Sequence, residues 1–420
     1  MRTILIVLFL LVASASAFAQ TIAITNARIY PVSGPPIARG TVLIRDGVIA
    51  AVGDNVSVPA GAQTIDGTGK IVTPGLVHSL TEVGVVEIGQ VRDTNDAAAK
   101  GTNNIAASFR VWDGLNPSST VFGPTRSEGV TTVIVAPRGG LVSGQAAAID
   151  LGTGHVSDVL RRASVAMIAQ VSSAVGAGTT ARGELIGKLR TLFDDVKYYA
   201  SHRGDYDRAQ TRALSAPIAD LEALIPVIEG KMPLVIDADS MADIDAALAL
   251  ARDYKLKIII SGGAEAWLSA DRLAAAQVPV LTGAMNNIPG SFATLNQRQE
   301  NAAMLRKAGV KVVLIGNTDG DENRFNARNI KYEAGNAVAY GMSYDDALRA
   351  ITLTPAELFG LSDHIGSLQT GRDANLVVWS GDPFEFSSQA EHVLIKGREI
   401  KEKSRQDMLT DRYKPGGRRP

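Results

Sequence analysis

The sequence predicts an α/β protein, a (β/α)₈ barrel of the TIM type with a small composite β-sandwich domain formed from both termini. Two observations lead to this prediction. Strand-rich segments with tight turns lie at both ends of the chain, and residues 74–363 between them alternate apolar strand-like runs with helical patterns. Such alternation is typical of parallel strands that are connected by helices.

Short β-rich runs with turn residues between them predict the β domain. Asp46-Gly47 separates two such runs near the start, and Asp-Gly between strands is a strong signal for a hairpin. Ala374–Trp379 and His392–Lys396 repeat this pattern near the other end. We therefore expect residues 20–73 and 364–403 to form one composite β domain.

Eight apolar runs predict the strands of the barrel. They are Leu76–Leu80, Thr132–Ala136, Ala147–Leu151, Val165–Ala169, Leu234–Asp237, Ile258–Ser261, Val278–Thr282 and Val312–Gly316. Ser240 and Ser343 are the expected N-caps of helices at Met241–Tyr254 and Tyr344–Ile351. Eight parallel strands with helices between them indicate a barrel with its active site at the C-terminal strand ends. An open doubly wound sheet is the alternative, but no Gly-rich phosphate loop follows the first strand.

The first residues have the pattern of a targeting segment. Arg2 is followed by an unbroken apolar run at Ile4–Val12, and Ala17-Phe18-Ala19 supplies the small–x–small pattern of a cleavage site. We expect residues 1–19 to be a cleaved signal peptide, which predicts a periplasmic or secreted protein. No later stretch approaches the length of a membrane-spanning helix, so no span is expected after cleavage.

The composition excludes several classes of partner and site. The 42 basic and 43 acidic residues nearly cancel, which gives no electrostatic reason to expect nucleic acid or an anionic membrane as partner. The chain has no cysteine, so a transition-metal site would need His, Asp and Glu ligands. Residues 404–420 form a locally basic tail that we expect to be poorly ordered.

Several motifs carry a resemblance to a known family. Ile71-Val72-Thr73-Pro74-Gly75-Leu76-Val77 precedes the first predicted barrel strand, and residues 366–379 lead from the last barrel helix into the β domain. In these motifs, and in Val142-Ser143-Gly144-Gln145, the chain resembles exported members of the amidohydrolase superfamily, over essentially the whole mature sequence. The resemblance implies hydrolysis of non-peptide carbon–nitrogen bonds with zinc or another divalent metal as cofactor.

The resemblance also implies where the metal ligands should lie, and the chain departs from that pattern. The family has a His–x–His pair on the first strand, a lysine or acid on the fourth, single histidines on the fifth and sixth, and an aspartate on the eighth. In this sequence Leu80 and Glu82 occupy the positions of the pair, Asp237 and Ser261 those of the single histidines, and Asp319 that of the aspartate.

His78 is the one histidine near these positions. Side chains alternate along a strand, so His78 could share a face with Leu80 and Glu82 and would lie about 7 Å deeper than Glu82. It is then a candidate substitute ligand. The alternative is a buried, hydrogen-bonded histidine without a role in metal binding.

Three interpretations of the site remain open. In the first, the chain binds a small molecule without turning it over, as a homo-oligomer or as a non-catalytic subunit beside an active amidohydrolase relative. In the second, Glu82, Asp237 and Asp319 hold a hard ion such as Mg²⁺, Ca²⁺ or Mn²⁺. In the third, the chain hydrolyses a substrate without metal, with Asp319 as the catalytic base. Glu82, Asp237 and Ser261 are the candidate substrate-binding residues, and the sequence does not identify the substrate.

The targeting pattern makes a direct prediction about the mature protein. Mass spectrometry of the periplasmic or secreted fraction should find an N-terminus near Gln20, because cleavage follows the small–x–small pattern of Ala17-Phe18-Ala19. Full-length protein found only in the cytoplasm would contradict the assignment of a signal peptide.

Overall fold

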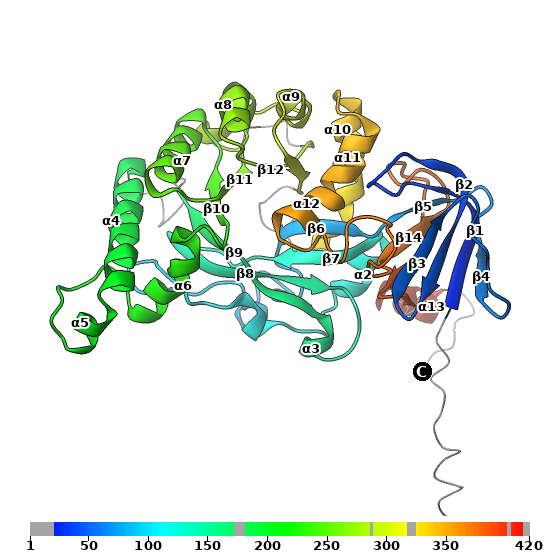
Figure 1. The fold of residues 1–420 in the computed structure, drawn as a ribbon, viewed down its shortest axis with the longest axis horizontal. Coiled ribbons are helices and arrows are strands. Elements are labelled where there is room, and N and C mark those ends of the chain that lie inside the picture. Colours follow the sequence, from blue (N-terminus) through cyan, green and yellow to red (C-terminus); the bar gives the residue numbers. More distant parts are fainter. Residues whose placement is uncertain (1–20, 172–180, 286–288, 317–324, 401–404, 415–420) are drawn as a thin grey trace, which may run out of the picture.

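The computed structural model describes residues 21–171, 181–285, 289–316, 325–400 and 405–414. Two sheets of eight strands each organise these residues. Figure 1 shows the larger sheet with an arc of helices outside it, and the smaller sheet at one end of the molecule. The predicted signal peptide lies outside the described residues.

The larger sheet is the predicted barrel. Its strands are β6 (Leu76–Thr81), β7 (Val130–Val135), β8 (Val142–Asp150), β9 (Leu160–Gln170), β10 (Leu234–Ala238), β11 (Ile258–Gly262), β12 (Val280–Thr282) and β13 (Val312–Leu314). They follow one another in sequence order across the sheet, and β13 lies next to β6, which nearly closes the barrel. A doubly wound sheet would reverse its strand order, so this alternative is excluded.

One strand differs from the prediction of eight parallel strands. β8 runs antiparallel to both of its neighbours, β7 and β9. The connections explain this difference. Residues 136–141 lead from β7 to β8, and a parallel strand would need a crossover of about a dozen residues or more. The chain therefore turns back directly, and the C-terminal end of β8 lies at the opposite end of the barrel from that of β7.

Alternating side chains divide the apolar residues of the strands into two layers. Val235, Ile259, Leu281 and Val313 belong to an inner cluster, whereas their sequence neighbours pack against helices in an outer cluster. Phe359 and other residues that follow the last barrel helix join the inner cluster. The barrel is therefore a filled core whose polar groups concentrate at the strand ends.

Helices connect the strands or cover their outer face. They are α2 (Phe122–Ser127), α3 (Val156–Val159), α4 (Arg182–Ser201), α5 (Arg203–Asp207), α6 (Ile218–Ile228), α7 (Met241–Tyr254), α8 (Ala270–Ala275), α9 (Asn301–Lys307), α10 (Ile330–Ala339), α11 (Tyr344–Ala350) and α12 (Leu353–Leu358). Both predicted N-caps are confirmed. The hydroxyl of Ser240 accepts from the backbone N–H of Asp243, and that of Ser343 accepts from Asp346.

The small sheet combines strands from both ends of the chain, as predicted. It contains β1 (Thr21–Ile29), β2 (Ile37–Arg45), β3 (Val48–Gly53), β4 (Gln63–Asp66), β5 (Ile71–Pro74), β14 (Leu376–Trp379), β15 (Ala390–Ile395) and β16 (Arg398–Glu399). Asp46 and Gly47 have φ values of 53° and 81°, so the predicted hairpin turn between β2 and β3 is confirmed. A two-residue turn with positive φ at both positions matches the twist of the strands that it joins.

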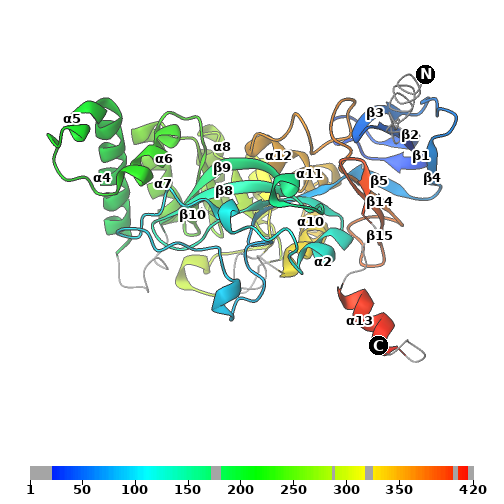
Figure 2. The same cartoon turned by 90° about the horizontal axis from the view of Figure 1, so that it is seen from below.

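The end of the chain differs from the expectation of a poorly ordered tail. A helix, α13 (Arg405–Tyr413), follows the small sheet and lies apart from the barrel in Figure 2. Lys414 pairs with Asp411 at its end, a spacing at which side chains meet on one helix face. Among the described residues, no helix combines the length and apolar character that a membrane crossing requires.

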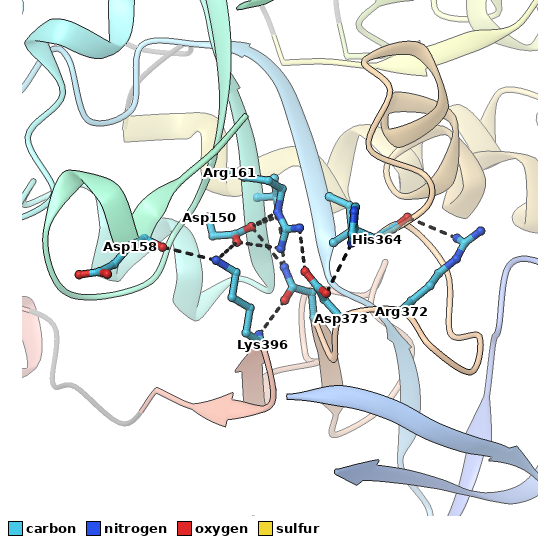
Figure 3. Close-up of polar contacts among 10 residues, drawn as sticks. Asp150, Asp158, Arg161, His364, Arg372, Asp373 and Lys396 are labelled. Carbon is cyan, nitrogen blue, oxygen red and sulfur yellow. Dashed lines mark hydrogen bonds and ion pairs between the residues drawn. The ribbon is translucent and has the colours of Figure 1, made fainter. Parts of the chain in front are cut away.

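A buried carboxylate joins the barrel to the small sheet. Asp150 ends β8 and accepts two hydrogen bonds of 2.8 Å from the guanidinium of Arg161 on β9. It also accepts from Thr132 on β7, and the ammonium of Lys396 lies 3.3 Å away. Figure 3 shows Asp150 and Arg161 of the barrel meeting Lys396 from the small sheet.

Arg161 extends this cluster into the segment that leads to β14. Its second amino group pairs with Asp373 at 2.7 Å. Burial alone lowers the pKa of Arg161, but its bonds and attraction to Asp150 and Asp373 outweigh that effect and raise the pKa. The guanidinium therefore stays charged between two carboxylates. We call Asp150, Arg161, Asp373 and Lys396 the interdomain cluster.

The interdomain cluster predicts a large effect of one substitution. Arg161→Met should lower the free energy of unfolding by about 3–5 kcal/mol, because it leaves a buried carboxylate without its main partner. Arg190→Met, which breaks an exposed pair with Asp253, is the matched control and should cost about 0–1 kcal/mol. Chemical denaturation followed by circular dichroism measures both. Equal effects of the two substitutions would show that the cluster is not a main support of the fold.

Candidate functional site

A cavity of about 640 Å³ opens at the C-terminal ends of the barrel strands. Its walls come from β6, β9, β10, β11 and the segments that follow β6 and β7. The lining residues are Leu80, Glu82, Arg92, Asn95, Ala98, Ala136, Pro137, Arg138, Gly139, Ile168, Gln170, Val235, Asp237 and Ser261. Its floor is apolar and its rim is polar, which is the usual make-up of a small-molecule site.

Three polar side chains lie at the same level across three adjacent strands. Asp237 on β10 is the register partner of Gln170 on β9 and of Ser261 on β11. Because all three strands are parallel, their C-terminal ends meet at this edge of the barrel. The structure therefore brings Asp237 and Ser261 together, and adds Gln170, which had no expected role.

The backbone beside Ser261 lies close to two carboxylates. Gly262 has a φ of 85°, a conformation that favours glycine. A Cβ atom at this position would lie 2.4 Å from Oδ1 of Asp239 and 3.3 Å from Oδ1 of Asp237. The absence of a side chain here allows the two carboxylates to pack against the end of β11.

Glu82 forms an ion pair across the cavity wall. Its side chain is buried, and its Oε1 lies 2.7 Å from Nε of Arg138, which follows β7 and is about half exposed. The carboxylate is thus held toward the second strand of the barrel. A guanidinium is a permanent cation that binds carboxylates well, so the pair gives this side of the cavity both signs of charge.

Leu80 has an unusual backbone conformation. Its φ is 58°, in the left-handed region that costs a non-glycine residue about 1–2 kcal/mol. Val77 and Leu80 both pack with the inner cluster although they are three residues apart. The alternation of side chains along β6 is therefore broken between them, where the pairing with β7 also shifts.

This break changes the position of His78. It does not line the cavity with Leu80 and Glu82, so the prediction that the three share one face is wrong. His78 is only 1% exposed, its Nδ1 lies 2.9 Å from the carbonyl oxygen of Ser79, and its Nε2 accepts from Gly316 N–H at 3.4 Å. Burial lowers the pKa of its imidazole to about 4. His78 is a buried, neutral, hydrogen-bonded side chain.

The described residues do not fit the metal that the resemblance implies. Leucine, glutamine and serine stand at three of the strand ends, and zinc prefers several nitrogen or sulfur donors. Glu82 is engaged by Arg138. Within the described ranges, no group of three His, Asp or Glu side chains has the arrangement of a metal site. Asp319, the candidate catalytic base, lies outside the described residues.

Two arginines of the cavity were not singled out from the sequence. Arg138 follows the second strand, and Arg92 belongs to a short 3₁₀ helix in the long segment after β6. The position of Arg138 could have been found, because the parallel strands of a barrel, β7 among them, end at the same face. Arg92 carried no sequence signal, since irregular segments do not reveal which residues they turn toward the mouth.

Comparisons with known proteins agree on one family. A model of the amidohydrolase family matches residues 281–400. The amidohydrolase tasK of Hapsidospora irregularis is 23% identical over 391 residues, which cover 85% of this chain but only 39% of that protein. An imidazolonepropionase of Mesorhizobium japonicum is 24% identical over 385 residues, covering 82% of this chain and 87% of that protein.

Solved structures agree with the sequence comparisons. An amidohydrolase from Thermotoga maritima superposes with a TM-score of 0.82 at 27% identity, over 91% of this chain and all of that structure. The match includes both the barrel and the small sheet, because it extends over nearly the whole described chain.

The buried histidine makes stability depend on pH. The pKa of His78 is about 4 in the folded chain and about 6.5 when unfolded. Between these pH values only the unfolded chain binds the proton. The contribution of His78 to the free energy of unfolding is therefore fully present above pH 6.5 and is lost as the pH falls toward 4. The loss should reach about 3 kcal/mol, since one pKa unit corresponds to about 1.4 kcal/mol.

The comparison of two histidine substitutions tests this dependence. His78→Gln should flatten the fall in unfolding free energy between pH 7.5 and 4.5, whereas His202→Gln, at an exposed histidine, should leave it unchanged. Denaturant titrations at a series of pH values measure this. A His78→Gln variant with the full pH dependence of the parent would show that other groups cause it.

Proposed function

This chain belongs to the amidohydrolase superfamily, and we propose that it binds a small molecule at the barrel mouth without the family's metal-dependent hydrolysis. The observation that carries the proposal is the set of side chains at the strand ends. A cavity of about 640 Å³ is retained, but Leu80, Gln170 and Ser261 replace residues that could hold zinc there. Binding needs only the cavity, whereas activating water needs the metal.

The charges of the cavity support an anionic or zwitterionic ligand. Arg92 and Arg138 supply two guanidinium groups at the rim, above a floor that includes Ile168 and Val235. A guanidinium binds a carboxylate with paired hydrogen bonds, and the floor accepts an apolar body. Because several relatives are imidazolonepropionases, imidazolonepropionate is a reasonable first probe.

A second candidate function is hydrolysis by an altered site. Glu82 and Asp237 line the same cavity, which favours this alternative. With Asp319 they would supply three carboxylates for a hard ion, or Asp319 would act as a base without metal. In both versions Asp319 is the catalytic residue, and Glu82, Asp237 and Ser261 bind the substrate.

We further propose that the protein acts outside the cytoplasm, after removal of residues 1–19. A binding protein of this kind would work as a homo-oligomer or as a non-catalytic subunit beside an active amidohydrolase relative. An intact barrel and small sheet support a retained role, since the fold still positions a cavity. Affinity purification from a periplasmic extract, followed by mass spectrometry, distinguishes the two kinds of partner.

Two cavity substitutions should change ligand binding in opposite directions. Calorimetric titration with imidazolonepropionate should show about tenfold weaker binding for Arg138→Met, which removes a charged hydrogen-bond donor. Glu82→Gln should bind more tightly, because it releases Arg138 from its ion pair. Arg190→Met, far from the cavity lining, is the control and should bind as the parent does.

Metal content and turnover decide between the two candidates. Elemental analysis of protein purified without chelator should find no stoichiometric zinc, and the bound probe should be recovered intact. One metal ion per chain that is lost on Asp237→Asn or Asp319→Asn, together with turnover, would reject the binding role in favour of hydrolysis.

A further inference from the structure

A second groove lies between the barrel helices and the small sheet. It has a volume of about 290 Å³ and shares no lining residue with the cavity at the barrel mouth. One wall is the outer face of α10 and the start of α11. The other is the segment between β14 and β15, which includes residues 382–386. Figure 1 shows α10 and α11 at the end of the barrel that faces the small sheet.

Four aromatic rings line this groove in two pairs. Tyr332 and Phe386 stack with centroids 4.2 Å apart, and Tyr344 and Phe384 are tilted by 41° with centroids 4.7 Å apart. Phe386 is 80% exposed, so most of its ring faces solvent. We call Tyr332, Tyr344, Phe384 and Phe386 the aromatic groove.

Carboxylates give the aromatic groove a negative charge. Asp382 and Glu385 both line it, and Oδ1 of Asp382 accepts from the Tyr344 hydroxyl at 3.1 Å and from the Phe384 N–H at 3.0 Å. These bonds hold the carboxylate between two of the rings. Burial, followed by the charge of Asp382, raises the pKa of Tyr344. The negative charges of Asp382 and Glu385 at this groove favour a bound cation.

One cation beside the groove, Lys331, is already balanced. The ammonium of Lys331 lies 4.9 Å from the centroid of the Tyr332 ring, is 1% exposed, and pairs with Glu128 at 2.8 Å. It also donates to the carbonyl oxygen of Ser388. The charge of Lys331 is thus directed to Glu128 and to the carbonyl oxygen of Ser388.

We propose that the aromatic groove binds a small organic cation with a methylated ammonium group. Such a group carries a diffuse, weakly hydrated charge that aromatic faces and nearby carboxylates attract together. A metal ion would need several oxygen ligands and would gain nothing from apolar rings. A neutral apolar molecule would gain nothing from Asp382 and Glu385.

A glycine on α10 allows the helix to approach the 382–386 segment closely. Gly335 faces the groove on α10, and a Cβ atom there would lie 3.2 Å from the carbonyl oxygen of Phe384 and 3.3 Å from its Cβ. Alanine has a higher helix propensity than glycine, so Gly335→Ala should not unfold the helix. It should narrow the groove between α10 and the 382–386 segment.

Calorimetric titration of the full-length mature chain with choline tests the proposal. Choline should bind saturably. Its uncharged isostere, 3,3-dimethylbutan-1-ol, should bind at least about tenfold more weakly. Phe386→Ala should weaken choline binding about three- to tenfold, and Asp382→Asn should act in the same direction. Phe292→Ala, at a ring that is 90% exposed outside the groove, should bind choline as the parent does.

Each outcome decides the proposal. Because Phe386 is largely exposed, its removal does not threaten the fold, and circular dichroism of the variants checks this. Equal binding of choline and the isostere would identify an apolar groove without cation recognition and overturn the proposal. Absence of saturation, or choline binding that is unchanged in Phe386→Ala and Gly335→Ala, would overturn it as well.

Discussion

The buried carboxylate of Asp150 is the interaction on which the arrangement of the two sheets depends. It lies at the end of β8, accepts from Thr132 and Arg161 on the neighbouring strands, and meets Lys396 from the small sheet. This position exists only because β8 runs antiparallel, which brings its C-terminal end to the end of the barrel opposite the cavity. A buried charge needs such partners, so the small sheet and three barrel strands are held together at one point.

That support lies at the opposite end of the barrel from the cavity. In barrels of this type, residues at the N-terminal ends of the parallel strands serve stability, whereas those at the C-terminal ends bind ligands. The separation lets the mouth change its chemistry without loss of the fold. Leu80, Gln170 and Ser261 lie at the strand ends, where the resemblance would place metal ligands, and Val235 and its neighbours fill the barrel below them. Leu80, with its positive φ, lies near the end of β6 and lines the cavity.

The candidate site was partly predictable. Asp237 and Ser261 could be placed at one level from their positions after two apolar runs, because parallel strands of a barrel end at one face. His78 was misplaced because simple alternation does not allow for the left-handed residue at Leu80. Arg92 was missed because its position depends on how the long segment after β6 folds back over the mouth, whereas Arg138 directly follows a parallel strand and could have been placed. The aromatic groove had no sequence signal. Its rings come from α10, α11 and the segment between β14 and β15, which are separate in the sequence and meet only in the folded chain.

The sequence by itself determined the eight strands of the barrel, the shared β domain, and the helix caps at Ser240 and Ser343. These features depend on local patterns, namely apolar runs, turn residues and capping side chains, which act over a few residues. Only the tertiary structure decided the direction of β8, the pairing of Glu82 with Arg138, and the hydrogen bond from Tyr344 of α11 to Asp382. Each of these joins residues from different elements, and the physical reason is that their distances follow from packing, which no local pattern encodes.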